Sequence, residues 1–84
     1  MKITLKLFAM LQDYLPGEAR KTNALTLDID EGSTAAQIIE RFALPPKMVH
    51  LVLIDGNFLP PAERAGRTLR EGETLAIWPP VAGG

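Results

Sequence analysis

The C-terminal run is the part of this 84-residue sequence whose residue types could do chemistry. It reads Trp78-Pro79-Pro80-Val81-Ala82-Gly83-Gly84, with no charged side chain before the terminal carboxylate. Fully extended, residues 79–84 reach about 20 Å, and the two prolines stiffen the base of the segment. Two final residues without side chains can pass through a narrow channel and present an unhindered carboxylate. We therefore expect acyl transfer from Gly84, with the segment inserted into a partner.

Activation of that carboxylate has to come from outside the chain. A carboxylate is a poor electrophile, so it must first become an acyl phosphate or an acyl adenylate. The sequence has no Walker-type glycine loop, no cysteine, one histidine (His50) and no patterned cluster of metal ligands. We expect no bound cofactor and no metal site, and we expect a partner enzyme to use the ATP. The alternative is that the two glycines are a frayed chain end that has no function.

Size and charge exclude several other classes of protein. A chain of 84 residues fits one domain. Its net charge is −1, and it has neither the basic surface typical of nucleic-acid-binding proteins nor a polybasic segment that would bind a membrane surface. Residues 1–6 alternate between polar and apolar, whereas a signal peptide needs a continuous apolar stretch. We expect a soluble, cytoplasmic protein that binds neither nucleic acid nor membranes.

The hydrophobic pattern predicts the elements that would position the terminus. Alternating or continuous apolar runs predict strands at 2–7, 22–30, 49–54, 57–59 and 73–78. A helix is expected from Thr34 to about Phe42, because Thr34 and Gln37 have the spacing of a capping box and two prolines follow. A short helical turn is expected at 9–15, and Asp55-Gly56 predicts a hairpin turn.

The order of these elements is that of a ubiquitin-like β-grasp fold. The fold class is α+β: a mixed sheet with one main helix packed on one face and an extended C-terminal tail. Residues 1–78 form the domain and residues 79–84 form a flexible Gly-Gly tail, which we expect to be exposed. The first and last strands are expected to lie side by side in the middle of the sheet.

Two aromatic residues are candidates for a partner-binding patch. By alternation, Leu75 and Ile77 take the inward face of the last strand, so Trp78 points outward, and Phe8 points outward at the end of the first strand. If the strands are neighbours, the two rings form part of an apolar patch at the base of the tail. The alternative is that Trp78 is an ordinary core residue.

The remaining polar residues predict structural roles. We expect His50 to be structural or on the surface, and Asp28, Asp30 and Glu31 to be strand-end, turn and helix-start acids. We expect Arg64, Arg67 and Arg70 to form a solvated face. The alternative is that they contact an acidic surface of a partner.

Several segments together resemble the MoaD/ThiS family of ubiquitin-like sulfur carriers, over essentially the whole chain. They are Leu7-Phe8-Ala9, Glu31-Gly32-Ser33-Thr34, Leu69-Arg70-Glu71-Gly72-Glu73 and the run from Ile77 to Gly84. The last of these is the specific one, because it is similar to the aromatic-Pro-Pro-Val-x-Gly-Gly end of the small subunit of molybdopterin synthase.

The resemblance implies a sulfur carrier that is not an enzyme on its own. An adenylyltransferase related to ubiquitin-activating enzymes would adenylate Gly84, and sulfur from a sulfurtransferase or persulfide donor would convert it to a thiocarboxylate. The large subunit of molybdopterin synthase would then receive the tail, residues Pro79, Pro80, Val81, Ala82 and Gly83. The sulfur would enter molybdopterin, the precursor of the molybdenum cofactor.

One segment departs from the pattern of molybdopterin carriers. Residues 54–61 carry an Asp-Gly hairpin and two prolines where a Val-Asn-Gln type of sequence is common. The alternatives are therefore a carrier for thiamine thiazole or another thiolated product, a ubiquitin-like protein modifier joined to lysine, and an interaction module with an inert tail.

Overall fold

The structure is a computed structural model that describes residues 1–80. Along this part of the chain the elements are β1 (Lys2–Leu7), η1 (Ala9–Tyr14), α1 (Ala19–Thr22), β2 (Ala24–Asp28), α2 (Ala35–Arg41), η2 (Pro46–Met48), β3 (Leu51–Ile54), β4 (Asn57–Phe58), η3 (Pro61–Glu63) and β5 (Thr74–Trp78). No helix within this stretch has the length and apolar character that crossing a bilayer requires.

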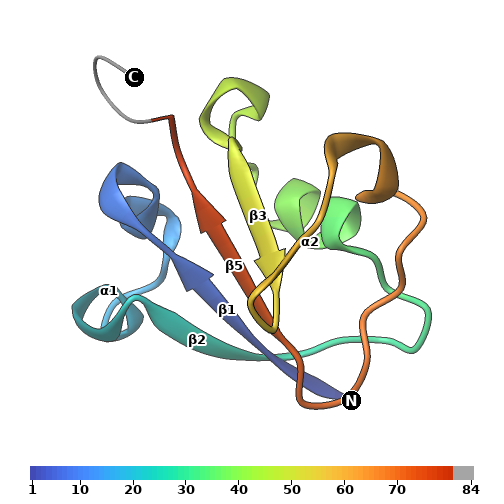
Figure 1. The fold of residues 1–84 in the computed structure, drawn as a ribbon. Helices are drawn as coiled ribbons and strands as arrows, with labels where there is room; N and C mark the ends of the chain where they lie inside the picture. Colours follow the sequence, from blue (N-terminus) through green and yellow to red (C-terminus); the bar gives the residue numbers. More distant parts are fainter. Residues whose placement is uncertain (81–84) are drawn as a thin grey trace.

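The strands form one mixed sheet in the order β2-β1-β5-β3-β4 (Figure 1). β1 and β5 run parallel, and the pairs β1–β2, β3–β5 and β3–β4 are antiparallel. The prediction that the first and last strands are neighbours in the middle of the sheet is confirmed. The ubiquitin-like β-grasp architecture expected from the order of the elements is confirmed with it.

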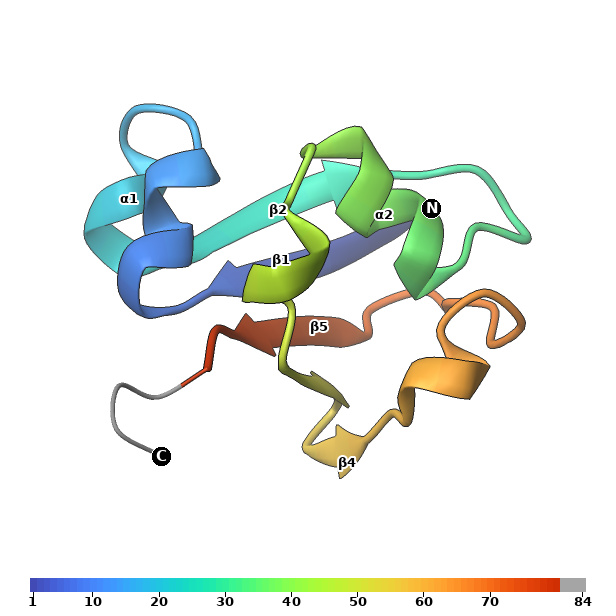
Figure 2. The same cartoon turned by 90° about the horizontal axis from the view of Figure 1, so that it is seen from above.

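The core lies between one face of this sheet and α2, which Figures 1 and 2 show on that face only. Leu5, Leu7, Leu75 and Ile77 have no measurable exposure, as alternation along the two central strands predicted. Burying such a side chain contributes about 1.5–3 kcal/mol relative to leaving it in water. The burial of these four residues therefore fixes the register of β5 against β1, and with it the place where the chain leaves the sheet.

α2 begins with the predicted capping box. The hydroxyl of Thr34 accepts a hydrogen bond from the backbone N–H of Gln37 at 3.3 Å, and the Gln37 side-chain oxygen accepts one from the Thr34 N–H at 2.9 Å. These two bonds satisfy backbone donors that a helix start otherwise leaves unpaired. The helix ends at Arg41 with Phe42 as its C-cap, which agrees with the predicted end.

Some boundaries differ from the predicted ones. The second strand begins at Ala24 and not at 22, because α1 precedes it and Asn23 has a left-handed backbone (φ 59°) that separates the two. β3 begins at Leu51 and not at 49, because η2 starts at the second proline of the pair at 45–46 and has Val49 as its C-cap. The connection at 62–72 is polar as expected, but Leu69 within it is buried.

The hairpin between β3 and β4 has the predicted turn. Asp55 and Gly56 have φ angles of 49° and 81°, the two positive values that a type I′ turn needs. The Asp55 carboxylate also accepts a hydrogen bond from the Thr74 N–H at 2.8 Å. The hairpin is thereby tied to the first residue of β5.

Candidate functional site at the end of strand β5

The chain leaves the sheet from its centre. β5 lies between β1 and β3, with Leu7 opposite Ile77 and Leu51 opposite Trp78. Backbone hydrogen bonds continue to the last residue of the strand: the His50 N–H donates to the Trp78 carbonyl at 3.0 Å, and the Phe8 N–H donates to the Ile77 carbonyl at 3.1 Å. The point of exit is therefore held from both sides.

Phe8 and Trp78 stack on each other beside this exit. Their ring centroids are 4.3 Å apart and their planes differ by 2°. Both residues are half-buried, and alternation along β5 places Trp78 on the face opposite to the buried Leu75 and Ile77. The two outward rings are thus neighbours, as predicted. Their role in binding a partner stays a prediction.

An apolar groove of about 410 Å³ continues from these rings to the base of the tail. It is lined by Ala9, Met10, His50, Leu51, Trp78, Pro79 and Pro80. Met10 is 59 % exposed, which is high for so large an apolar side chain. His50 is the one titratable residue of the lining, so the groove suits an apolar occupant.

The predicted exposed tail begins one residue later than expected. Pro79 is buried and Pro80 is exposed, so Pro79 belongs to the folded body and the prediction of an exposed residue at 79 is wrong. Pro79 directly follows Trp78, whose carbonyl is bonded to the His50 N–H, so the chain is still held against the folded body at this point. The predicted insertion residues Val81, Ala82 and Gly83 and the predicted reactive residue Gly84 lie outside the described residues.

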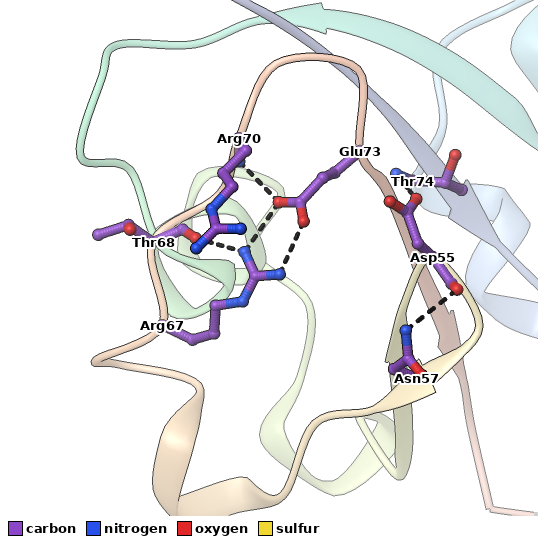
Figure 3. Close-up of polar contacts among 7 residues, drawn as sticks. All are labelled: Asp55, Asn57, Arg67, Thr68, Arg70, Glu73 and Thr74. Carbon is purple, nitrogen blue, oxygen red and sulfur yellow. Dashed lines mark hydrogen bonds and ion pairs between the residues drawn. The ribbon is translucent and has the colours of Figure 1, made fainter.

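An ion pair fixes the loop that leads into β5 (Figure 3). Arg67 donates through both Nη atoms to the Glu73 carboxylate, at 2.8 and 2.7 Å, and Glu73 also accepts from the Arg70 N–H at 2.6 Å. The bond to Arg67 is the main cause that lowers the pKa of the Glu73 carboxyl below its usual value. Glu73 is buried and Arg67 is half-buried, so solvent and salt screen this pair less than an exposed one.

The prediction that the three arginines form a solvated face is wrong for two of them. Arg67 is bound to Glu73, as described above. Arg64 donates to the carbonyls of Val49 and His50, at 3.4 and 3.2 Å, and so holds the residues that precede β3. Burial lowers the pKa of Arg64, and its Nε has no hydrogen-bond partner among residues 1–80. The sequence pattern did not reveal these bonds, because Glu73 lies six residues from Arg67 across a turn, and the two acceptors of Arg64 lie 15 and 14 residues before it.

The groove at the exit of the tail has His50 as its one titratable lining residue. Within residues 1–80 no three histidine, aspartate or glutamate side chains are placed to hold a metal ion. A larger groove of about 560 Å³ lies between α2 and the end of β2, with Asp28, Asp30, Glu40 and Arg41 among its lining. Since β2 is antiparallel to β1, this polar groove is at the opposite end of the sheet from the exit.

Comparison with protein families decides where the chain belongs. The ThiS family model matches residues 14–84, which is most of the sequence and includes the terminal glycines. The chain belongs to the ThiS family. The resemblance to ubiquitin-like sulfur carriers that the sequence segments indicated is thereby confirmed. Among curated protein sequences, none matches this ThiS-family chain.

Solved structures share the fold of this ThiS-family chain. SAMP1 from Haloferax volcanii is 22 % identical, with a TM-score of 0.71 and full coverage of both chains. The HVO 2177 protein of the same organism is 18 % identical, with a TM-score of 0.75, and the match covers 100 % of this chain and 87 % of that one. A chain from the complex of subunits 1 and 2 of the molybdopterin-converting factor of Helicobacter pylori is 14 % identical, with a TM-score of 0.61 and full coverage of both chains.

Proposed function

We propose that this ThiS-family protein is a cytoplasmic sulfur carrier whose Gly84 carboxylate is converted to a thiocarboxylate that donates sulfur in the synthesis of molybdopterin. The observation that supports this most is the match to the ThiS family, which extends to Gly84 itself. The protein is not an enzyme on its own in this proposal. It supplies the reacting group, and its partners supply the catalysis.

The proposed chemistry needs only the carboxylate from this chain. A Gly84 carboxylate oxygen attacks the α-phosphorus of ATP on a partner adenylyltransferase, and pyrophosphate leaves. Hydrosulfide, released from the persulfide of a sulfurtransferase or other persulfide donor by a thiol that is itself oxidised to a disulfide, then attacks the carbonyl carbon of the acyl adenylate. The bond from that carbon to the AMP oxygen breaks, AMP leaves, and a thiocarboxylate remains. The first step is a substitution at phosphorus and the second is an acyl substitution, and an unhindered glycine terminus favours both.

The folded body serves as the part that partners hold. β5 is fixed by its two neighbouring strands, and the loop before it is fixed by the ion pair of Arg67 and Glu73. The stacked rings of Phe8 and Trp78 lie beside the exit of the tail, and alternation along β5 places Trp78 on the face opposite to the buried Leu75 and Ile77. We propose that this face contacts the adenylyltransferase and, later, the subunit that accepts sulfur.

The choice of molybdopterin rests on the sequence of the tail and on one structural neighbour. That neighbour is a subunit in a complex of two subunits of the molybdopterin-converting factor, which supports a large subunit as the partner. A second candidate is a carrier for thiamine thiazole, favoured by the identity of the matching family model. The two candidates share the same activated terminus and differ in the protein that accepts the sulfur.

A transfer assay separates the two pathways. The thiocarboxylated protein is incubated either with the large subunit of a molybdopterin synthase from the same genome and cyclic pyranopterin monophosphate, or with the thiazole synthase of that genome and its substrates. We expect loss of the terminal sulfur and formation of molybdopterin in the first mixture. Sulfur transfer in the second mixture alone would contradict the molybdopterin assignment and would show that the protein supplies sulfur for thiazole.

A further inference from the structure

The side chain of Arg64 binds the backbone that lies next to the exit of the tail. Arg64 is the C-cap of η3, and its guanidinium donates to the Val49 carbonyl through Nη1 at 3.4 Å and to the His50 carbonyl through Nη2 at 3.2 Å. The His50 N–H donates in turn to the Trp78 carbonyl at 3.0 Å. Arg64 is thereby connected, through one short stretch of backbone, to the last residue of β5.

A single peptide group makes this connection. The carbonyl of Val49 and the N–H of His50 belong to the same planar amide, which accepts from Arg64 through its oxygen and donates to Trp78 through its N–H. A charged donor polarises the amide that accepts from it, and hydrogen bonds in such a chain strengthen one another. Loss of the guanidinium therefore weakens the bond that the Trp78 carbonyl accepts.

The backbone of Arg64 is itself held by the start of α2. The Ala36 N–H, in the first turn of that helix, donates to the Arg64 carbonyl at 2.9 Å, and the Arg64 N–H donates to the Pro61 carbonyl at 3.3 Å. The guanidinium therefore reaches the amide between Val49 and His50 from a fixed position.

The Trp78 carbonyl has particular weight because two prolines follow it. Pro79 and Pro80 have no N–H to donate, and their rings fix φ near about −65°. Few soft angles are left at the base of the tail, and the first of them is ψ of Trp78, which the bond from the His50 N–H holds. A fully extended segment of six residues reaches about 20 Å, so a rotation of about 10° at its base displaces its end by about 3 Å.

The fold gains little free energy from this arginine. Its Nε is buried and has no hydrogen-bond partner among residues 1–80, and burial disfavours the charged form and so lowers the pKa of the guanidinium. His50 is exposed, so water can hydrate its carbonyl in the absence of the arginine. We therefore expect an apolar side chain of similar length to support the fold about as well.

We propose that Arg64 is a positioning residue for the reacting chain end: by holding the amide between Val49 and His50 it fixes the Trp78 carbonyl, and with it the direction in which the two following prolines leave the sheet. The inference rests on the proposed carrier function, because a fixed direction matters when a partner takes the terminus. Arg64 acts through the backbone and not on the reacting carboxylate.

Two substitutions of Arg64 and one control separate this role from a general contribution to the fold. Arg64→Met keeps the aliphatic stem and removes every donor, whereas Arg64→Lys keeps a charged donor for one of the two carbonyls. Arg41→Met is the matched control, because the Arg41 guanidinium donates to the Asp28 carbonyl at 3.2 Å, at the opposite end of the sheet. We expect all three variants to unfold in urea at midpoints close to that of the parent.

Hydrogen exchange of the full-length protein, followed by NMR, measures the contact itself. In Arg64→Met we expect the His50 N–H to exchange about fivefold faster than in the parent, with a smaller effect in Arg64→Lys and none in Arg41→Met. The N–H groups of Leu5 and Leu75, in the core, should exchange as in the parent. An unchanged rate at His50 overturns the inference. An equal acceleration of all three N–H groups overturns it too, because that result reflects a general loss of stability.

The kinetics of an adenylyltransferase from the same genome, with the full-length carrier as substrate, measure the consequence. Docking of the folded body is expected to set KM, and insertion of the terminus to set kcat. Arg64→Met should therefore lower kcat about fivefold at an unchanged KM, Arg64→Lys should restore part of the loss, and Arg41→Met should keep both parameters.

The two measurements keep this inference separate from the proposed function. A parent that is modified no faster than Arg64→Met overturns the positioning role and leaves the carrier function standing. A parent that no such enzyme modifies contradicts the carrier function instead, and the exchange rate of the His50 N–H then decides whether Arg64 holds the exit of the tail.

Discussion

The side chain of Glu73 accepts both Nη atoms of Arg67, at 2.8 and 2.7 Å, one residue before β5 begins. The two residues come from a polar connection and from a tight turn, and their pairing joins the two parts of the loop that leads into β5 (Figure 3). Since β5 carries Trp78 at its far end, the pair contributes to the placement of the tail.

This pair predicts a loss of stability in acid. The pKa of Glu73 is lower in the folded protein than its ordinary value, so the carboxylate stabilises the fold fully above the pKa of the unfolded chain, about 4.3. That contribution is lost as the pH falls through the lower, folded pKa. Urea unfolding at about pH 7 and about pH 3 should show a larger loss in the parent than in Glu73→Gln, which has no titrating group at this position.

A second carboxyl, that of Asp28, also makes the stability depend on pH. Its bond to Lys2 lowers its pKa, so its contribution to the free energy of unfolding is lost in acid as well, and the comparison with Glu73→Gln is needed to separate the two. The Asp28–Lys2 pair is exposed and is present in both proteins, so it cancels in the difference between them. Identical acid losses in the parent and in Glu73→Gln would show that the Arg67–Glu73 pair contributes nothing to pH-dependent stability.

The stacked rings predict a substitution that separates stability from partner binding. Phe8→Ala should lower the free energy of unfolding by about 1 kcal/mol, the order of an aromatic pair contact, because the ring is half-buried on the open face. Leu5→Ala, in the fully buried core, should cost about 2–5 kcal/mol. Urea denaturation measures both.

For binding to the adenylyltransferase, we expect the larger loss of affinity in Phe8→Ala and the smaller one in Leu5→Ala. Titration calorimetry at a temperature where both variants remain folded measures the two affinities. Phe8→Ala should bind more weakly than Leu5→Ala, because Phe8 lies on the surface that we propose as the contact. Equal affinities would remove Phe8 from the interface, and a stability loss as large as that of Leu5→Ala would place its ring in the core.

The capping box predicts a specific cost at the start of α2. Thr34→Ala removes the acceptor for the Gln37 N–H and should lower the free energy of unfolding by about 1 kcal/mol. Ser33→Ala is the matched control, because the Ser33 hydroxyl is bonded to the Asp30 carbonyl in the loop and does not cap the helix. Chemical denaturation of the three proteins tests this, and equal losses would contradict a capping role.

Much of the fold could be predicted because the decisive patterns are local. The alternation of Ile3, Leu5 and Leu7 indicated which face of the first strand is buried, and the spacing of Thr34 and Gln37 marked the helix start. The same alternation placed Phe8 and Trp78 outward on neighbouring strands. Their stacking then follows from the parallel pairing of β1 and β5.

The parts that sequence reasoning missed either lack an apolar pattern or depend on how the chain folds back on itself. The helix α1 has four polar or small residues and no apolar periodicity, so nothing in the pattern marked it. Arg67 and Glu73 lie six residues apart in a mostly polar connection, and their pairing is visible only once the loop is folded. The groove likewise joins Met10, His50 and Pro79 from three separate segments, which no spacing along the chain could reveal.

The central claim is that the chain terminus is the reacting group, and intact-mass spectrometry tests it most directly. The parent protein and a variant that lacks Gly84 are incubated with ATP, a sulfide source and an adenylyltransferase of the ubiquitin-activating type from the same genome. We predict that one oxygen is replaced by sulfur in the parent, that fragmentation places the change on Gly84, and that the shortened variant is unchanged. An unmodified parent with every such enzyme of that genome, or equal modification of the shortened variant, would contradict the account.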